Sequence, residues 1–150
     1  MSWLIANINC HKKPISHIWS NTLISRNTYD NLYEQWNNIE HQHWKKFVDA
    51  MKIEVYFHND FTSMLTPKKS NEYIGYWFFQ QRTDRSNRGE IELINGTDKK
   101  ILSYCSNTIL IIETDKNFTV LPRKHELPQR PFCEIYFDQA TNKKIKKLLN

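Results

Sequence analysis

The spacing of hydrophobic residues changes from a helical to a strand pattern near residue 52. From 28 to 51 apolar residues recur every three or four positions, which is the spacing of one face of an α-helix. Asn27 or Thr28 can cap this segment, and lysines lie near its C-terminal end. The positions on the apolar face are Tyr29, Leu32, Tyr33, Trp36, Ile39, His43, Phe47, Val48 and Met51. The pattern predicts one long amphipathic helix over 28–51.

Beyond residue 52 the pattern predicts β-strands. Apolar and polar residues alternate over 90–94, and Asn95-Gly96 is typical of a two-residue hairpin turn. The other segments expected to form strands are 53–57, 73–82, 100–105, 108–114, 117–121 and 132–137. Residues 139–149 follow a capping Asp138 and predict a short C-terminal helix. Residues 1–26 contain two apolar runs, one on each side of Pro14. The first could form a strand, and the second could form a strand or a short helix.

A run of strands with helices before and after it favours an α+β fold. We expect an antiparallel β-sheet or open barrel of about five to seven strands, with the long helix packed on one face. At 150 residues the chain fits one domain, spanning 1–150. Four aromatic residues in a row over 76–79 place large rings on both faces of one strand. Trp77 and Phe78 are therefore expected in the core, with the long helix covering one of these faces.

The stretch ILIIETDKNFTVLPRKHEL resembles the end of bacterial pleckstrin-like domains. In both, a hairpin leads through a proline and basic residues, here Leu121-Pro122-Arg123-Lys124, to a last strand and a closing helix. The resemblance covers the last third of the chain, and the long helix before the sheet departs from it. It implies a sheet closed by a helix, and it implies no function.

Composition favours a cytoplasmic protein without a membrane segment. No apolar run approaches the roughly 20 residues of a membrane span, and the start of the chain has no basic leader. The three cysteines, Cys10, Cys105 and Cys133, lack CxxC spacing, which is typical of free thiols in a reducing compartment. Cys105 and Cys133 lie in apolar runs and are expected to be buried. Asn, Ile and Lys together make 46 residues, which indicates an AT-rich genome such as that of a low-GC bacterium, a phage or a virus.

The motifs of common enzyme classes are missing from the sequence. Three glycines are too few for a phosphate-cradling loop, and neither GxGxxG nor GxxxxGK[ST] occurs. No GxSxG elbow marks a nucleophile. We therefore expect no cofactor and assign no catalytic residue, and an enzymatic role stays uncertain and less favoured.

Two groups of residues are weighed as metal ligands. His41 and His43 are two apart, so on one helix they point to different faces, with His43 on the apolar face as a core histidine. His58 and Asp60 follow the strand at 53–57, and Glu90 and Glu92 share one strand face. The last four support an alternative function as a metal-dependent nuclease or hydrolase.

Basic residues gather at two places and carry the leading hypothesis. Residues 116–150 hold eight basic and three acidic side chains, a net charge of +5. The candidate binding residues are Arg82, Arg85 and Arg88 in one loop, then Arg123, Lys124, Arg130, Lys143, Lys144, Lys146 and Lys147. We expect a non-enzymatic intracellular binding protein of the inhibitor, immunity or anti-defence type, which contacts an acidic protein partner through basic and aromatic side chains. Nucleic-acid binding through the same basic residues is the alternative.

Overall fold

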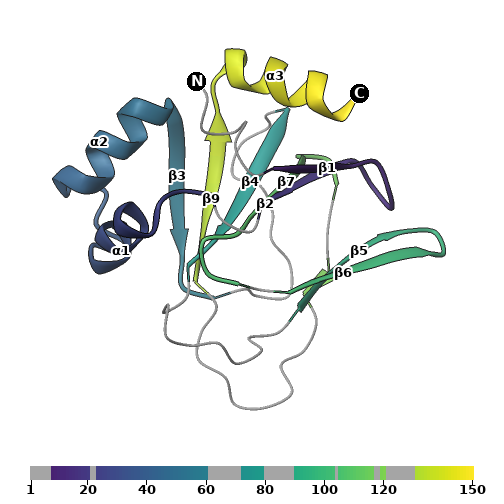
Figure 1. Cartoon of the computed structure of the whole chain (residues 1–150), viewed down its shortest axis with the longest axis horizontal. Coiled ribbons are helices and arrows are strands. Elements are labelled where there is room, and N and C mark those ends of the chain that lie inside the picture. Colours follow the sequence, from purple (N-terminus) through teal and green to yellow (C-terminus); the bar gives the residue numbers. More distant parts are fainter. Residues whose placement is uncertain are drawn as a thin grey trace.

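The computed structural model describes residues 8–20, 23–60, 72–79, 90–103, 105–116, 119–120 and 131–150 (Figure 1). The helices are α1 (Arg26–Glu34), α2 (Gln42–Met51) and α3 (Gln139–Leu149). The strands are β1 (Asn9–His11), β2 (His17–Ser20), β3 (Ile53–His58), β4 (Tyr73–Phe78), β5 (Glu90–Asn95), β6 (Asp98–Ser103), β7 (Ile109–Glu113), β8 (Thr119–Val120) and β9 (Phe132–Phe137). The class is α+β with antiparallel pairing, as the sequence predicts.

Six strands form the larger sheet, in the order β1-β2-β7-β4-β9-β3. β4 and β9 lie near its centre, and every residue of both is buried. A strand buried on both faces has to be apolar throughout rather than alternating, which is what the sequence of β4 provides. Gly75 lets the side chains of Ile109 and Phe137 approach closely, because a Cβ there would lie 3.1 Å from an atom of each.

Three strands form a smaller sheet, in the order β6-β5-β8, and the chain passes back and forth between the two sheets. Between the sheets lies a buried apolar cluster: Ile74, Tyr76, Phe78, Ile91, Leu93, Leu102, Leu110, Ile112, Phe132 and Tyr136. The fold is thus a two-layer antiparallel sandwich. We call the space between the sheets the sandwich interior.

The outer face of the larger sheet is covered by helices (Figure 1). Tyr29 and Leu32 from α1 and Trp44 and Phe47 from α2 belong to a second buried cluster, which also holds Trp77. Trp77 faces these helices, whereas Phe78 faces the sandwich interior, and both are fully buried. The prediction that both are core residues is confirmed. Helices cover the face of β4 that carries Trp77, and the smaller sheet covers the face that carries Phe78.

The prediction of one long helix over 28–51 is wrong, because the helix is interrupted between Glu34 and Gln42. Gln35 ends α1, and Asn37 adopts a left-handed backbone with φ of 62°. Asparagine tolerates this conformation better than most residues. His41 then caps α2 by accepting a hydrogen bond at Nδ1 from the His43 backbone amide, at 3.2 Å. Trp36 still packs on the aromatic core, but beyond it the predicted face fails: Ile39 and His43 are exposed, and Trp44, which did not fit the spacing, is fully buried.

The short C-terminal helix is present as predicted. The Asp138 carboxylate accepts a hydrogen bond from the Thr141 backbone amide at 2.9 Å, which caps α3. Hydrogen bonds with the Thr141 side chain and with this amide lower the pKa of Asp138. Ile145 and Leu149 are buried against the sheet and its neighbours. These two side chains fix which face of α3 lies against the fold and which faces water.

Two further predictions concern exposure and membranes. Cys133 is buried as expected, but Cys105 is exposed because it lies outside the strands rather than within one. In the described part of the chain, none of the helices has the length and apolarity that crossing a bilayer requires.

Candidate functional site

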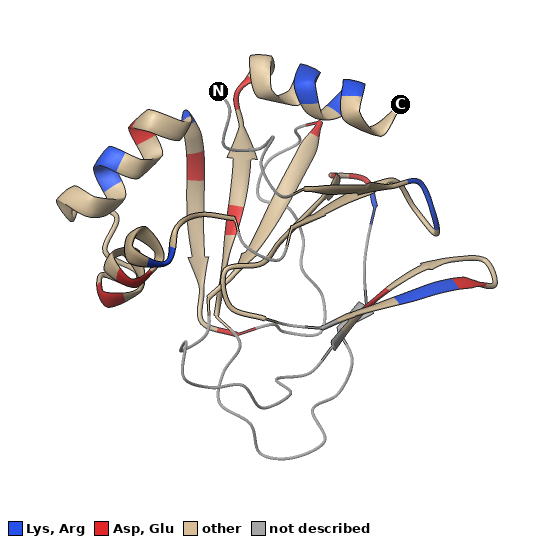
Figure 2. Cartoon of the chain, in the orientation of Figure 1, with Lys and Arg blue, Asp and Glu red and all other residues tan. Residues whose placement is uncertain are grey.

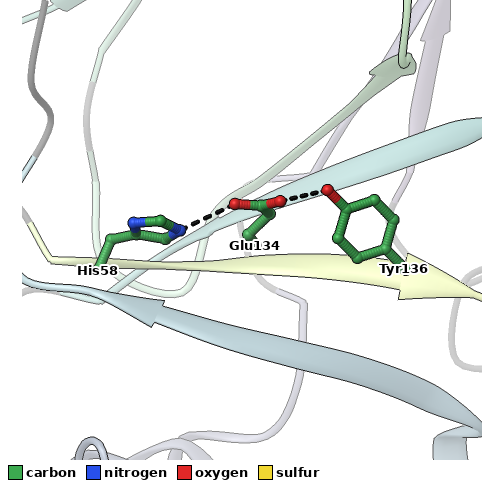
Figure 3. Close-up of polar contacts among 3 residues, drawn as sticks. All are labelled: His58, Glu134 and Tyr136. Atoms are coloured by element: carbon green, nitrogen blue, oxygen red, sulfur yellow. Dashed lines mark hydrogen bonds and ion pairs between the residues drawn. The ribbon is translucent and has the colours of Figure 1, made fainter. Parts of the chain in front are cut away.

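A chain of polar side chains lies in the sandwich interior, at the edge of the larger sheet formed by β3 and β9. His58 Nε2 and Glu134 Oε1 are 2.8 Å apart, and the Tyr136 hydroxyl donates to Glu134 Oε2 (Figure 3). Glu134 is 3% exposed, whereas the His58 side chain is 24% exposed. The carboxylate is therefore inside the protein, and the imidazole is the member of the chain that solvent reaches.

The register of the two strands places these groups together. β3 and β9 pair antiparallel, with His58 opposite Phe132 and Tyr56 opposite Glu134. Side chains alternate between faces along a strand, so Phe132, Glu134 and Tyr136 all point into the sandwich interior. The His58 ring stacks on Phe132, with centroids 4.5 Å apart and planes at 6°. This stacking and the bond to Glu134 together hold the imidazole in one orientation.

Tyr76 on β4 faces the same group. Burial raises the pKa of Tyr76, and the negative charge of Glu134 and the nearby Tyr136 raise it further. The Tyr76 hydroxyl therefore stays protonated at neutral pH and remains a hydrogen-bond donor. Chemically, this end of the interior offers an imidazole oriented by a buried carboxylate, which is the arrangement of a general acid–base group, beside two phenols.

Glu134 and Tyr136 were missed in the sequence. The sequence signal for them was a single charged residue, Glu134, inside the apolar strand FCEIYF. Such a residue indicates a polar site, because a buried carboxylate needs hydrogen-bond partners. Sequence alone could not name His58 as that partner, since 76 positions separate the two residues.

Two of the four residues considered for a metal-dependent enzyme, His58 and Glu92, are not brought together in the described structure. His58 faces the sandwich interior, whereas Glu92 alternates with the interior residues Ile91 and Leu93 and so points away from it. The side chain of Glu90 lies outside what the structure describes. Across the described residues, no group of three or more His, Cys, Asp or Glu side chains is arranged to hold a metal ion.

The histidines at 41 and 43 also differ from expectation. His43 is exposed rather than a core histidine. Because His41 precedes α2 instead of continuing a helix, the two rings lie 4.8 Å apart rather than on different faces. Their contact belongs to the cap of α2.

The predicted binding residues divide into two sets. Arg82, Arg85, Arg88, Arg123, Lys124 and Arg130 lie outside the described residues. Lys143, Lys144, Lys146 and Lys147 are all exposed on α3 (Figure 2). Lys146 lies 3.6 Å from Glu72 at the start of β4. The aromatic side chains expected at a binding surface are mostly in the two buried clusters instead.

Comparison with known proteins places the fold and nothing finer. No family model matches the chain, and no curated protein matches it. Among solved structures, the chain is similar to the crystal structure of a Pseudomonas putida prolyl-4-hydroxylase. The match has a TM-score of 0.60 and 7% sequence identity, and it covers 81% of this chain and 87% of that chain. At this identity the likeness concerns the fold alone.

Proposed function

We propose that this protein is a non-enzymatic binding protein of the inhibitor or immunity type, which contacts an acidic protein partner through the basic face of α3. One observation carries the proposal: α3 presents Lys143, Lys144, Lys146 and Lys147 to solvent while Ile145 and Leu149 are buried. A helix anchored in this way presents its charges in a fixed arrangement, so little conformational freedom of the backbone is lost on binding.

The charge of this face favours an acidic partner. The last turn of α3 carries Lys146 and Lys147, where basic residues also interact favourably with the helix dipole. Clustered positive charge raises the rate of encounter with an acidic surface and selects against basic ones. An intracellular location and a viral or bacterial defence setting belong to this proposal and rest on composition.

A charge-reversal experiment tests the proposal. The variant Lys143→Glu/Lys144→Glu/Lys147→Glu leaves the contact between Lys146 and Glu72 in place. The matched control, Lys46→Glu/Lys99→Glu/Lys116→Glu, makes the same change of net charge at exposed lysines elsewhere. Fluorescence anisotropy then measures binding to labelled poly-glutamate, duplex DNA and single-stranded RNA at about 20 and about 150 mM salt.

We expect the natural protein to bind poly-glutamate. The α3 variant should weaken the affinity about tenfold, because three exposed charge pairs are lost at up to about 0.5 kcal/mol each. The control should change the affinity by no more than about twofold. Stronger binding to DNA or RNA, with a steep salt dependence lost in the α3 variant, favours the nucleic-acid alternative. If no probe binds at near-physiological salt, or the control weakens binding as much as the α3 variant, the proposal is refuted.

A second candidate is a metal-dependent enzyme at the interior end near His58. The observation in its favour is the shared fold with a protein named a prolyl-4-hydroxylase, together with the His58-Asn59-Asp60 sequence at the end of β3. Non-haem iron oxygenases hold their metal with two histidines and one carboxylate. His58 and Asp60 would supply one of each.

The described residues do not fit that set. They hold no third ligand within a metal-binding group, and His58 Nε2 already bonds to Glu134. We derive no reaction step from it. Titration calorimetry with Fe²⁺ under anaerobic conditions, and with Mn²⁺ and Zn²⁺, tests this candidate. Saturable binding lost in both His58→Ala and Asp60→Asn would favour it over the binding-protein proposal, and the absence of binding would remove it.

A further inference from the structure

A second polar group lies at the opposite edge of the sandwich interior, where β1 and β2 approach β6. His11 and His17 are direct register partners on β1 and β2, and their rings stack with centroids 4.9 Å apart and planes at 19°. Lys100 reaches them from β6 in the smaller sheet, with Nζ 3.2 Å from His17 Nε2. We call His11, His17 and Lys100 the basic cluster.

The proton positions in the basic cluster follow from its partners. His17 Nδ1 lies 2.8 Å from the Ile15 carbonyl oxygen, which only accepts, so Nδ1 carries the proton. His17 Nε2 then accepts a hydrogen bond from the Lys100 ammonium. Burial, followed by the charges of Lys100 and His11, lowers the pKa of His17 to about 4, although the bond to Ile15 opposes the shift. His17 is thus a neutral, fully buried acceptor that fixes the direction of the Lys100 side chain.

This arrangement leaves the outer side of the cluster positive. An ammonium has three donors, and His17 takes one of them, so two others of Lys100 can serve a ligand. His11 and Lys100 are both only partly buried, so a small solute can reach them. Lys12 and Lys13 follow β1 directly, and the basic turn between β1 and β2 and the basic segment of β6 are visible in Figure 2.

The environment of the basic cluster disfavours protonation of all three of its side chains. Burial and Lys100 lower the pKa of His11, and burial lowers the pKa of Lys100 itself. After burial, the charge of Lys100 lowers the pKa of both histidines, and His11 lowers the pKa of His17 further. An anion at this place would offset the positive charge of Lys100 and supply acceptors for the remaining donors.

We infer that His11, His17 and Lys100 form an oxyanion-binding site for a phosphate group, with Lys100 as the principal ligand and His17 as the residue that positions it. Phosphate oxygens match a directed ammonium and an imidazole N–H, both of which make charge-assisted hydrogen bonds. The site lies at the edge formed by β1 and β2 and does not depend on the proposed role of α3.

The test follows the imidazole nitrogens directly. Protein with ¹⁵N-labelled histidine is titrated with inorganic phosphate at pH 7 and constant ionic strength, sodium chloride being the reference, and long-range ¹H–¹⁵N spectra report each ring. The variants are Lys100→Gln and Lys100→Arg, the second of which keeps the charge. Lys99→Gln is the matched control, because Lys99 is the neighbouring exposed lysine on the opposite face of β6.

We expect saturable changes at His11 and His17 that Lys100→Gln weakens about tenfold or more, while Lys100→Arg and Lys99→Gln retain them. A parallel titration with a thymidine dinucleotide, a phosphodiester, distinguishes the source of the phosphate. Binding of both ligands supports a site that accepts a nucleic-acid backbone, and binding of inorganic phosphate alone supports a site for the free anion. No response beyond that to chloride, or an equal response in Lys100→Gln, overturns the inference.

Discussion

Replacing His58 by phenylalanine tests whether Glu134 depends on its histidine partner. The phenylalanine ring keeps the stacking on Phe132, whose centroid lies 4.5 Å from that of His58, so the substitution removes chiefly the bond to Glu134. The 3% exposed carboxylate would then retain the Tyr136 hydroxyl but lose its nitrogen partner. A buried carboxylate that loses a partner is destabilising because water, which reaches only the His58 side of this pair, replaces the lost bond incompletely.

The magnitude follows from the exposure of the two groups. Removing one partner of a fully buried charged pair costs about 3–5 kcal/mol. The His58 side chain is 24% exposed, so water reaches this side of the pair and the cost falls below that of a fully buried pair. We expect His58→Phe to lower the free energy of unfolding by about 2–3 kcal/mol. Glu134→Leu should cost about 1–2 kcal/mol, because the buried Tyr136 hydroxyl then lacks this acceptor.

The decisive comparison is with the triple variant His58→Phe/Glu134→Leu/Tyr136→Phe. Apolar groups of similar size often replace a buried polar network at little cost, so we expect the triple variant within about 1 kcal/mol of the natural protein. Urea unfolding followed by tryptophan fluorescence measures all variants, with His43→Phe, at an exposed position of α2, as the control. If the single substitutions cost less than about 0.5 kcal/mol, or the triple variant loses the sum of the singles, the reasoning about Glu134 is wrong.

Three further predictions concern other parts of the fold. Asn107 has φ of 60°, and its side chain accepts a hydrogen bond from Trp77 Nε1 at 3.2 Å and donates one to the Ile24 carbonyl oxygen at 2.7 Å. Asn107→Gly should keep the backbone conformation but lower the free energy of unfolding by about 2–3 kcal/mol, because both hydrogen bonds are lost. An unchanged midpoint of urea unfolding would contradict this. Lys52 ends α2 with φ of 55°, so Lys52→Gly should raise the free energy of unfolding by about 0.5–1 kcal/mol, whereas Lys52→Val should lower it. The folded pKa of His17, about 4, lies below its ordinary value of 6.5, so the unfolded chain binds the proton first and stability is lost as pH falls from about 6.5 toward 4. The free energy of unfolding should therefore differ less between pH 7 and pH 5 in His17→Asn than in the natural protein, by about 1 kcal/mol after allowance for solvent screening at the sheet edge. Equal pH dependence in both proteins would refute the lowered pKa of His17.

The interrupted helix shows how far periodicity carries a prediction. Trp36 fits the helical spacing and packs on the aromatic core, yet it lies in the turn between α1 and α2. Hydrophobic spacing indicates the core face only while the helix is continuous: beyond the break the predicted Ile39 and His43 are exposed, whereas Trp44 is buried. At the break Asn37 adopts a left-handed backbone, which asparagine tolerates better than most residues.

The candidate site shows the complementary limit. His58 and Asp60 could be named from the sequence because they follow a strand together. Glu134 could be noted only as a charged residue in an apolar strand, and its bond to His58 depends on the register of β3 against β9. A shift of that register by one residue would turn Glu134 away from the sandwich interior, so a long-range pairing decides the contact.

The sequence by itself determined the class of fold, the identity of the central strand and the exposed basic face of α3. Each is set by the local spacing of apolar residues. Apolar residues repeat every two positions in strands and about every 3.6 in helices, and β4 carries them on both faces. Only the tertiary structure decided that the second cover of β4 is a sheet rather than a helix, and which polar groups meet between the two sheets. The physical reason is that His58 with Glu134, and His17 with Lys100, are 76 and 83 positions apart, so their contacts come from strand order and register rather than from local sequence.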